Sequence, residues 1–156
     1  MVERMARFTV SVEVHAPAAE VWAALVDWRN HARWAPLTTV RLTTERMDGP
    51  GAGFVARSHL GPLGFDDPMT VVGWEPPEGE RPGRCDIDKH GRVIRGRAWF
   101  RVLPLEAGRC RVDWSEDVTV VPHRLDRVTG ALVAAVGRAG FGQALRKMAR
   151  EVERRS

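Results

Sequence analysis

The chain has 156 residues, of which 44% are apolar and 28% charged, with a formal net charge of +4. This length suits one domain with a sizeable core, and we expect residues 1–156 to form a single domain. No apolar run approaches the ~20 residues of a membrane span. The first five residues lack the apolar core of a signal peptide, which favours a cytoplasmic location.

The positive charge does not indicate a nucleic-acid partner. Lysine occurs only at Lys89 and Lys147, and the other basic residues are arginines that mostly lie beside acidic residues. The densest basic stretch, residues 146–155, also contains Glu151 and Glu153, as the solvated face of a helix would. No basic strand is interleaved with aromatic residues, so we expect no nucleic-acid binding.

The first strand and the helices after it are clear in the pattern. Residues Ala6–His15 alternate between apolar and polar side chains, which predicts a half-buried strand. Pro17 suits a first helical turn, and Ala18–Asp27 carries apolar residues at helical spacing. A second short helix is expected from Asn30 until just before Pro36.

Six more strands are expected, separated by turns rich in glycine and proline. Their predicted ranges are Thr39–Thr44, Phe54–Leu60, Met69–Trp74, Arg84–Lys89, Arg92–Leu103 and Arg109–Val121. The short connections predict an antiparallel meander. A long helix over Leu125–Arg154 would give this sheet a second wall.

The last helix carries two apolar stripes that lie on opposite faces at about 100° per residue. The first stripe is Leu125, Val128, Leu132 and Val136, and the second is Phe141, Leu145, Met148 and Val152. Gly137, Gly140 and Gly142 lie between them. We favour a kink there that turns both stripes to one core, because exposed apolar stripes are uncommon. The alternative is an unbroken helix with Gly130, Ala134 and Gly137 facing inward and the first stripe facing a partner.

Glu116 is the sharpest candidate for chemistry. It shares a strand face with residues that are otherwise apolar: Cys110, Val112, Trp114, Val118 and Val120. A carboxylate there could be a general base or a ligand anchor with a raised pKa. The favoured alternative is a structural hydrogen bond or ion pair, for example with an arginine of a neighbouring strand.

Other polar groups give weaker signals. Arg57 and His59 share one strand face, and Asp66 and Asp67 begin the next strand, so an acid–base pair is conceivable. The favoured interpretation is a strand end facing water. For His31, a surface turn is favoured over a position at the mouth of a cavity. Asp86, Asp88 and His90 stand about 7 Å apart at each step of one strand and are assigned to its solvent face. The two cysteines, Cys85 and Cys110, lack metal or redox spacing. We therefore expect no metal and no cofactor.

Several segments, in this order, resemble a known superfamily. They are Ala16-Pro17, Glu20-Val21-Trp22, Asp27-Trp28 through Trp34, Trp74-Glu75-Pro76-Pro77, Val112-Asp113-Trp114-Ser115-Glu116 and Ala144-Leu145-Arg146-Lys147-Met148. The chain resembles the START and pollen-allergen-like (SRPBCC) superfamily, and more narrowly its bacterial polyketide cyclase/dehydrase branch. The resemblance implies an α+β helix-grip fold, with a curved antiparallel sheet of about seven strands wrapped around a long C-terminal helix. Two short helices would follow the first strand, and a deep apolar cavity would lie between sheet and long helix.

Three functions follow as hypotheses. The leading one is binding of a small hydrophobic ligand (a lipid, polyketide or aromatic compound) by a monomer or homodimer, without catalysis. The cavity would be lined by Phe54, Trp74, Ile94, Phe100, Trp114, Phe141 and Leu145, unless these residues form a fully packed core. Gly96 and Ala98 favour a cavity, because they would face the small residues of the last helix.

The second hypothesis is a cyclase or dehydratase with Glu116 as acid or base, assisted by His59 or Arg57. The third is an interaction module that uses the exposed first stripe of the last helix.

Overall fold

The structure is a computed structural model that describes residues 6–60, 63–120 and 126–156. In these ranges the chain forms one seven-stranded sheet, three α-helices and a short 3-10 helix. Their bounds are β1 (Ala6–Val14), α1 (Ala18–Val26), η1 (Trp28–Asn30), α2 (His31–Trp34), β2 (Thr38–Leu42), β3 (Gly53–Leu60), β4 (Leu63–Glu75), β5 (Gly83–His90), β6 (Ile94–Pro104), β7 (Cys110–Val120) and α3 (Asp126–Arg155). The predicted element order is therefore confirmed.

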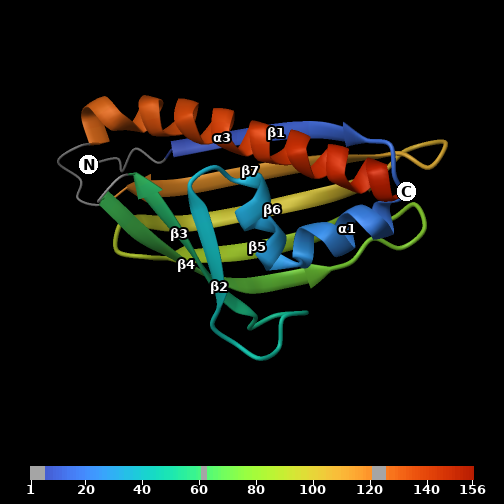
Figure 1. The fold of residues 1–156 in the computed structure, drawn as a ribbon, viewed down its shortest axis with the longest axis horizontal. Coiled ribbons are helices and arrows are strands. Elements are labelled where there is room, and N and C mark those ends of the chain that lie inside the picture. Colours follow the sequence, from blue (N-terminus) through green and yellow to red (C-terminus); the bar gives the residue numbers. More distant parts are fainter. Residues whose placement is uncertain (1–5, 61–62, 121–125) are drawn as a thin grey trace.

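The sheet is an antiparallel meander from β2 to β7, to which β1 adds as the outer neighbour of β7. The helix α3 runs along β1 on one face of this sheet, and α1 lies near the C-terminal end of α3 (Figure 1). This arrangement confirms the predicted α+β helix-grip fold. The inner face of the sheet is the face that the helices cover.

Aromatic rings fill the core between the sheet and the helices. Trp28 stacks on Phe54 with 4.5 Å between ring centroids. Phe100, Trp114 and Phe141 form a column with successive centroid distances of 5.4 and 5.3 Å. Stacked rings of this kind leave little free volume between β3, β6, β7 and α3.

The strand β4 begins at Leu63, six residues before the predicted start at Met69. It pairs with β3 from Leu63 but with β5 only from Met69, and its register shifts between Val71 and Gly73. The sequence thus predicted the doubly paired part of the strand. The earlier part includes Asp67, whose side chain is buried.

The favoured kink in the last helix is wrong, because α3 is continuous from Asp126 to Arg155. Three members of the second stripe, Leu145, Met148 and Val152, are buried, whereas Val136 of the first stripe is 63% exposed. A Cβ on Gly137 would lie only 2.8 Å from Cε1 of Phe8, so the absence of a side chain lets the straight helix approach β1. Leu125 lies outside the described residues, as do the side chains of 126–134, which include the rest of the first stripe.

No helix in the described ranges has both the length and the apolar character that crossing a bilayer requires. In the same part of the chain, no group of three or more His, Cys, Asp or Glu side chains is arranged as metal ligands.

Candidate functional site

A buried ionic cluster joins three strands on the inner face of the sheet. The Nζ atom of Lys89 on β5 lies 2.9 Å from Oδ2 of Asp67 on β4 and 3.0 Å from Oε1 of Glu116 on β7. The three side chains are only 4%, 9% and 5% exposed, respectively. The indole N–H of Trp114 donates to the same Oε1 at 3.4 Å. The favoured interpretation of Glu116 as an ion-pair member agrees with this geometry, but its partner is Lys89 and not an arginine.

Two small residues on β6 stand between Lys89 and Glu116. Lys89 and Glu116 are two strand positions apart, roughly 10 Å of sheet, with β6 between them. Opposite them on β6 stand Gly96, which pairs with Lys89, and Ala98, which pairs with Glu116. Gly96 has φ +143°, and a Cβ there would lie 2.2 Å from the backbone oxygen of Asp117. The missing side chain of Gly96 therefore lets β6 approach the backbone of β7 closely.

The charges of the cluster perturb one another strongly. Burial raises the pKa of Glu116, an effect that Lys89 opposes and the nearby Asp67 reinforces. Burial alone would lower the pKa of Lys89, but the attraction of Glu116 and Asp67 outweighs it and raises this pKa. One lysine cation is therefore shared between two carboxyl groups in a site closed to water.

Arg57 and His59 are not part of this cluster. Both are exposed, and the Nη1 of Arg57 pairs at 2.8 Å with Oδ1 of Asp66, which is also exposed. Asp66 and Asp67 are adjacent in β4, so their side chains point to opposite faces of the sheet. The water-facing interpretation of Arg57 and His59 fits the structure, which gives no support to their assisting a reaction at Glu116.

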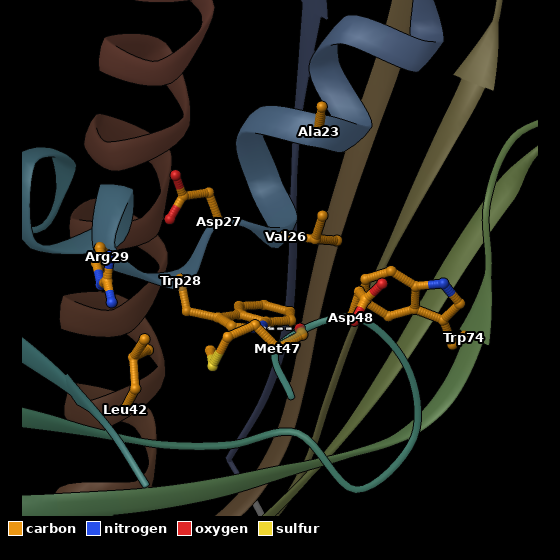
Figure 2. A pocket seen from close by; sticks show the side chains of 9 residues that line it. All are labelled: Ala23, Val26, Asp27, Trp28, Arg29, Leu42, Met47, Asp48 and Trp74. Carbon is orange, nitrogen blue, oxygen red and sulfur yellow. Dashed lines mark hydrogen bonds between the residues drawn. The ribbon is translucent and has the colours of Figure 1, made fainter. Parts of the chain in front are cut away.

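The larger hollow of about 320 Å³ lies between the end of α1 and the β2–β3 connection (Figure 2). Its lining residues are Ala23, Val26, Asp27, Trp28, Arg29, Leu42, Met47, Asp48 and Trp74. The indole N–H of Trp28 donates to the backbone oxygen of Met47 at 3.2 Å, which ties η1 to the connection. Among the seven residues predicted to line a cavity, Trp74 lines this hollow.

A second, smaller hollow of about 40 Å³ lies between α2, β7 and α3. It is lined by Leu25, His31, Trp34, Ala35, Trp114, Phe141, Ala144 and Leu145. This volume holds about one water molecule. Trp114, Phe141 and Leu145, three more of the predicted cavity residues, thus line a very small space. Phe54 and Phe100 belong to the packed rings, and Ile94 lines neither hollow.

The surface turn favoured for His31 is wrong, because His31 begins α2 and lines the smaller hollow, which agrees with the cavity alternative. Its Nε2–H donates to the backbone oxygen of Leu25 at 2.7 Å, and its ring packs between Trp28 and Trp34. Burial lowers the pKa of this imidazole, only partly offset by the hydrogen bond to Leu25 and by the charge of Asp27. His31 is therefore a neutral wall of the smaller hollow near pH 7.

The sequence family described as "Polyketide cyclase / dehydrase and lipid transport" matches residues 5–153, almost the whole chain. The chain belongs to this family. No curated protein matches this polyketide cyclase-like chain in sequence.

Several solved structures share the fold of this family member. They include the Zhui aromatase/cyclase from Streptomyces, at 19% identity and TM-score 0.70, covering 97% of this chain and 95% of that one. A START superfamily protein from Mycobacterium smegmatis matches at 17% identity and TM-score 0.74, covering 96% and 99%. The human StarD13 lipid transfer and protein localization domain matches at 16% identity and TM-score 0.63, covering 90% and 78%. The family match confirms the polyketide cyclase/dehydrase branch predicted from the sequence, and these structures confirm the START-like fold.

Sequence reasoning missed Lys89 and favoured a water-facing strand end for Asp67, which is wrong because the side chain of Asp67 is buried. A signal for Lys89 was present, because it continues the inward alternation of Cys85 and Ile87 on β5. The family supports a role in hydrophobic ligand binding or cyclisation.

Proposed function

We propose that this polyketide cyclase-like chain binds a small, mostly apolar ring compound in the hollow between Trp28 and Trp74. The observation that carries this proposal is the hollow itself, whose volume of about 320 Å³ lies in the range of small-molecule sites. Its walls combine two indole rings with the aliphatic side chains of Leu42 and Val26 and the thioether of Met47. Such walls favour flat apolar rings.

The two indole walls are held in place before any ligand arrives. Trp28 is fully buried, stacks on Phe54 and donates its N–H to Met47. Trp74 is half-buried and meets Trp22 edge to face, with 5.3 Å between centroids. Walls that are already ordered reduce the entropy cost of binding.

The rim of the hollow is charged. Asp27, Arg29 and Asp48 are exposed and border its mouth (Figure 2). A ligand with one polar end would therefore place its rings inside and its polar end at the mouth. An aromatase/cyclase and a lipid transfer domain share this fold, which supports a ring-bearing or lipid-like ligand.

A cyclase or dehydratase reaction at Glu116 is a second candidate. The observation that favours it is the raised pKa of the buried Glu116 carboxyl, as in many general acids and bases. Against it, the carboxyl is 5% exposed and already engaged by Lys89 and Trp114. Ligand binding without catalysis is thus the better-supported function.

The test uses N-phenyl-1-naphthylamine, a neutral fluorescent ring compound. We expect Trp74→Ala to weaken its binding about tenfold, or ~1.4 kcal/mol, because one wall of the hollow is lost. The control is Val72→Ala on the same strand, where the side chain is 50% exposed and does not line the hollow. Thermal unfolding of both variants checks that each is folded. Equal affinities for the two variants would refute the proposed site.

A further inference from the structure

We propose that the exposed face of the C-terminal half of α3 docks on an anionic lipid surface. The helix α3 covers the inner face of the sheet, and the docking surface is the side of the helix that is turned away from the sheet (Figure 1). This surface is separate from the hollow of the proposed function, because no residue that lines the hollow belongs to α3.

Four cations share this side of the helix. Arg146, Arg150 and Arg154 follow one another at intervals of four residues, about 6 Å along the helix axis, and all three are exposed. At about 100° per residue, Lys147 falls with them in one sector that spans about 100° of the helix circumference. The buried second stripe of α3 faces the opposite way. The four cations therefore form a basic row that points to solvent.

The acidic residues of α3 do not neutralise the basic row. Among the α3 side chains that the structure describes, they are Glu151 and Glu153, and both are half-buried. Glu151 already accepts hydrogen bonds from Arg33 and Trp34 of α2, and Glu153 accepts one from the backbone N–H of His15 at 3.0 Å. Within the described part of the chain, none of the four cations of the row forms an ion pair.

The shape and chemistry of the face fit a lipid surface. Because α3 is continuous, Val136 lies in the same sector as the basic row, about 27 Å before Arg154, and it is 63% exposed. A flat layer of anionic head groups would contact the cations and this apolar side chain together. The one aromatic ring among the described α3 side chains, Phe141, stacks on Trp114 in the core. The face therefore offers no stacking platform for nucleic-acid bases.

The test measures co-sedimentation of the ligand-free protein with lipid vesicles. One kind of vesicle contains equal amounts of phosphatidylglycerol and phosphatidylcholine, and the other contains phosphatidylcholine alone. We expect binding only to the anionic vesicles at ~0.1 M salt, and binding at least about tenfold weaker at ~0.5 M salt, because salt screens the attraction. Equal binding to both kinds of vesicle, or no binding to either, would overturn the proposal.

The first variant removes three cations of the basic row: Arg146→Gln, Arg150→Gln and Arg154→Gln together. We expect it to bind the anionic vesicles about 100-fold more weakly than the wild type, because each cation near an anionic bilayer contributes about fivefold in affinity. All three side chains are exposed, so the variant should fold, and thermal unfolding checks this.

The matched control loses the same net charge from other parts of the chain. It combines Arg41→Gln on β2, Arg92→Gln in the β5–β6 turn and Arg97→Gln on β6, which are all exposed. We expect its affinity for the anionic vesicles to stay within about threefold of the wild type. Equal losses in the two triple variants would show that net charge alone drives binding, and would overturn the assignment to α3.

A fluorescent label shows which side of the protein meets the lipid. Nitrobenzoxadiazole attached through Gln143→Cys, an exposed position in the middle of the face, should shift its emission to the blue on anionic vesicles. The control is Glu45→Cys in the β2–β3 connection, at the edge of the sheet opposite to β1 and α3 (Figure 1). The two native cysteines are fully buried and should escape labelling. A shift at Glu45→Cys as large as that at Gln143→Cys would contradict docking through α3.

Discussion

The ammonium group of Lys89 lies 3.0 Å from the carboxylate of Glu116, although β6 separates the strands that carry them. The lysine side chain crosses β6 above Gly96 and Ala98. It is bonded to two buried carboxyl groups, since Asp67 shares it. The stability of the sheet should therefore depend on this lysine more than on any surface ion pair.

Replacing Lys89 by methionine should destabilise the protein strongly. Lys89→Met leaves the buried carboxyl groups of Asp67 and Glu116 without their cation, which typically costs about 3–5 kcal/mol at neutral pH. The measurement is urea unfolding of the variant and the wild type. The control is Arg57→Met, which removes an exposed ion pair with Asp66 and should cost at most about 1 kcal/mol. Similar losses in the two variants would contradict the importance of the cluster.

The contact of Glu151 with α2 should make stability depend on pH in the acid range. Hydrogen bonds from Arg33 and Trp34 hold the pKa of Glu151 below its usual value. The folded state then binds fewer protons at this group than the unfolded state. The contact of Glu151 therefore adds to the free energy of unfolding above the unfolded-state pKa, near 4.5. This stabilisation is lost as the pH falls through the lower pKa of the folded state.

Glu151→Gln should therefore lower the free energy of unfolding by up to about 1 kcal/mol at neutral pH. The difference in free energy of unfolding between Glu151→Gln and the wild type should disappear below about pH 4, as measured by urea unfolding over a pH series. Glu45→Gln, at an exposed glutamate outside this contact, serves as the control. If this difference in free energy grew on acidification, the pKa of Glu151 would be raised in the folded state and not lowered.

Replacing two glycines of α3 by alanine should change the stability of the protein in opposite directions. A Cβ on Gly140 would meet no atom within 4 Å, so Gly140→Ala should stabilise the helix by about 0.5–1 kcal/mol. A Cβ on Gly137 would press on the ring of Phe8 at 2.8 Å, and overpacking of this kind costs about 1–3 kcal/mol. Thermal unfolding of the two variants checks this. A higher melting temperature for Gly137→Ala than for Gly140→Ala would contradict the close approach of α3 to β1.

Neither cysteine should react in the folded protein. Burial raises the pKa of Cys85 to about 12 and that of Cys110 to about 11, and both thiols are fully buried. Ellman's reagent near pH ~8 should label no thiol in the native state and both in urea, because the reactive species is the thiolate. Rapid labelling without denaturant would show that the β5–β7 region opens readily.

Strand alternation predicted the inward face of β7 correctly from Cys110 to Val118, because this part of the strand pairs in regular register with both β1 and β6. It favoured a water-facing position for Asp67, which is wrong, because this part of β4 lies before the predicted strand and pairs only with β3. The helix α3 was predicted to kink because its two stripes lie on opposite faces. Periodicity could not show that Gly137 lets a straight helix approach Phe8.

The candidate site was harder to predict than the fold. The aromatic residues were correctly recognised as belonging to the interior, but whether rings enclose space or stack on one another depends on their rotamers. Phe100 and Trp114 stack at 5.4 Å, whereas Trp74 borders open space. Lys89 was overlooked because lysine is rarely buried, and only its two carboxyl partners on distant strands make burial tolerable.

The pairing of β1 with β7 has a consequence for the order of folding. The hydroxyl oxygens of Thr9 and Ser115 are 2.8 Å apart, yet these residues are 106 positions apart in the sequence. During synthesis β1 emerges before β7, its neighbour in the sheet, and must wait until the five strands between them have been made. The helix α3, which packs along β1, emerges later still. We expect the β2–β7 meander to form first and the N-terminal strand to join last, so that folding is slow for a chain of this size.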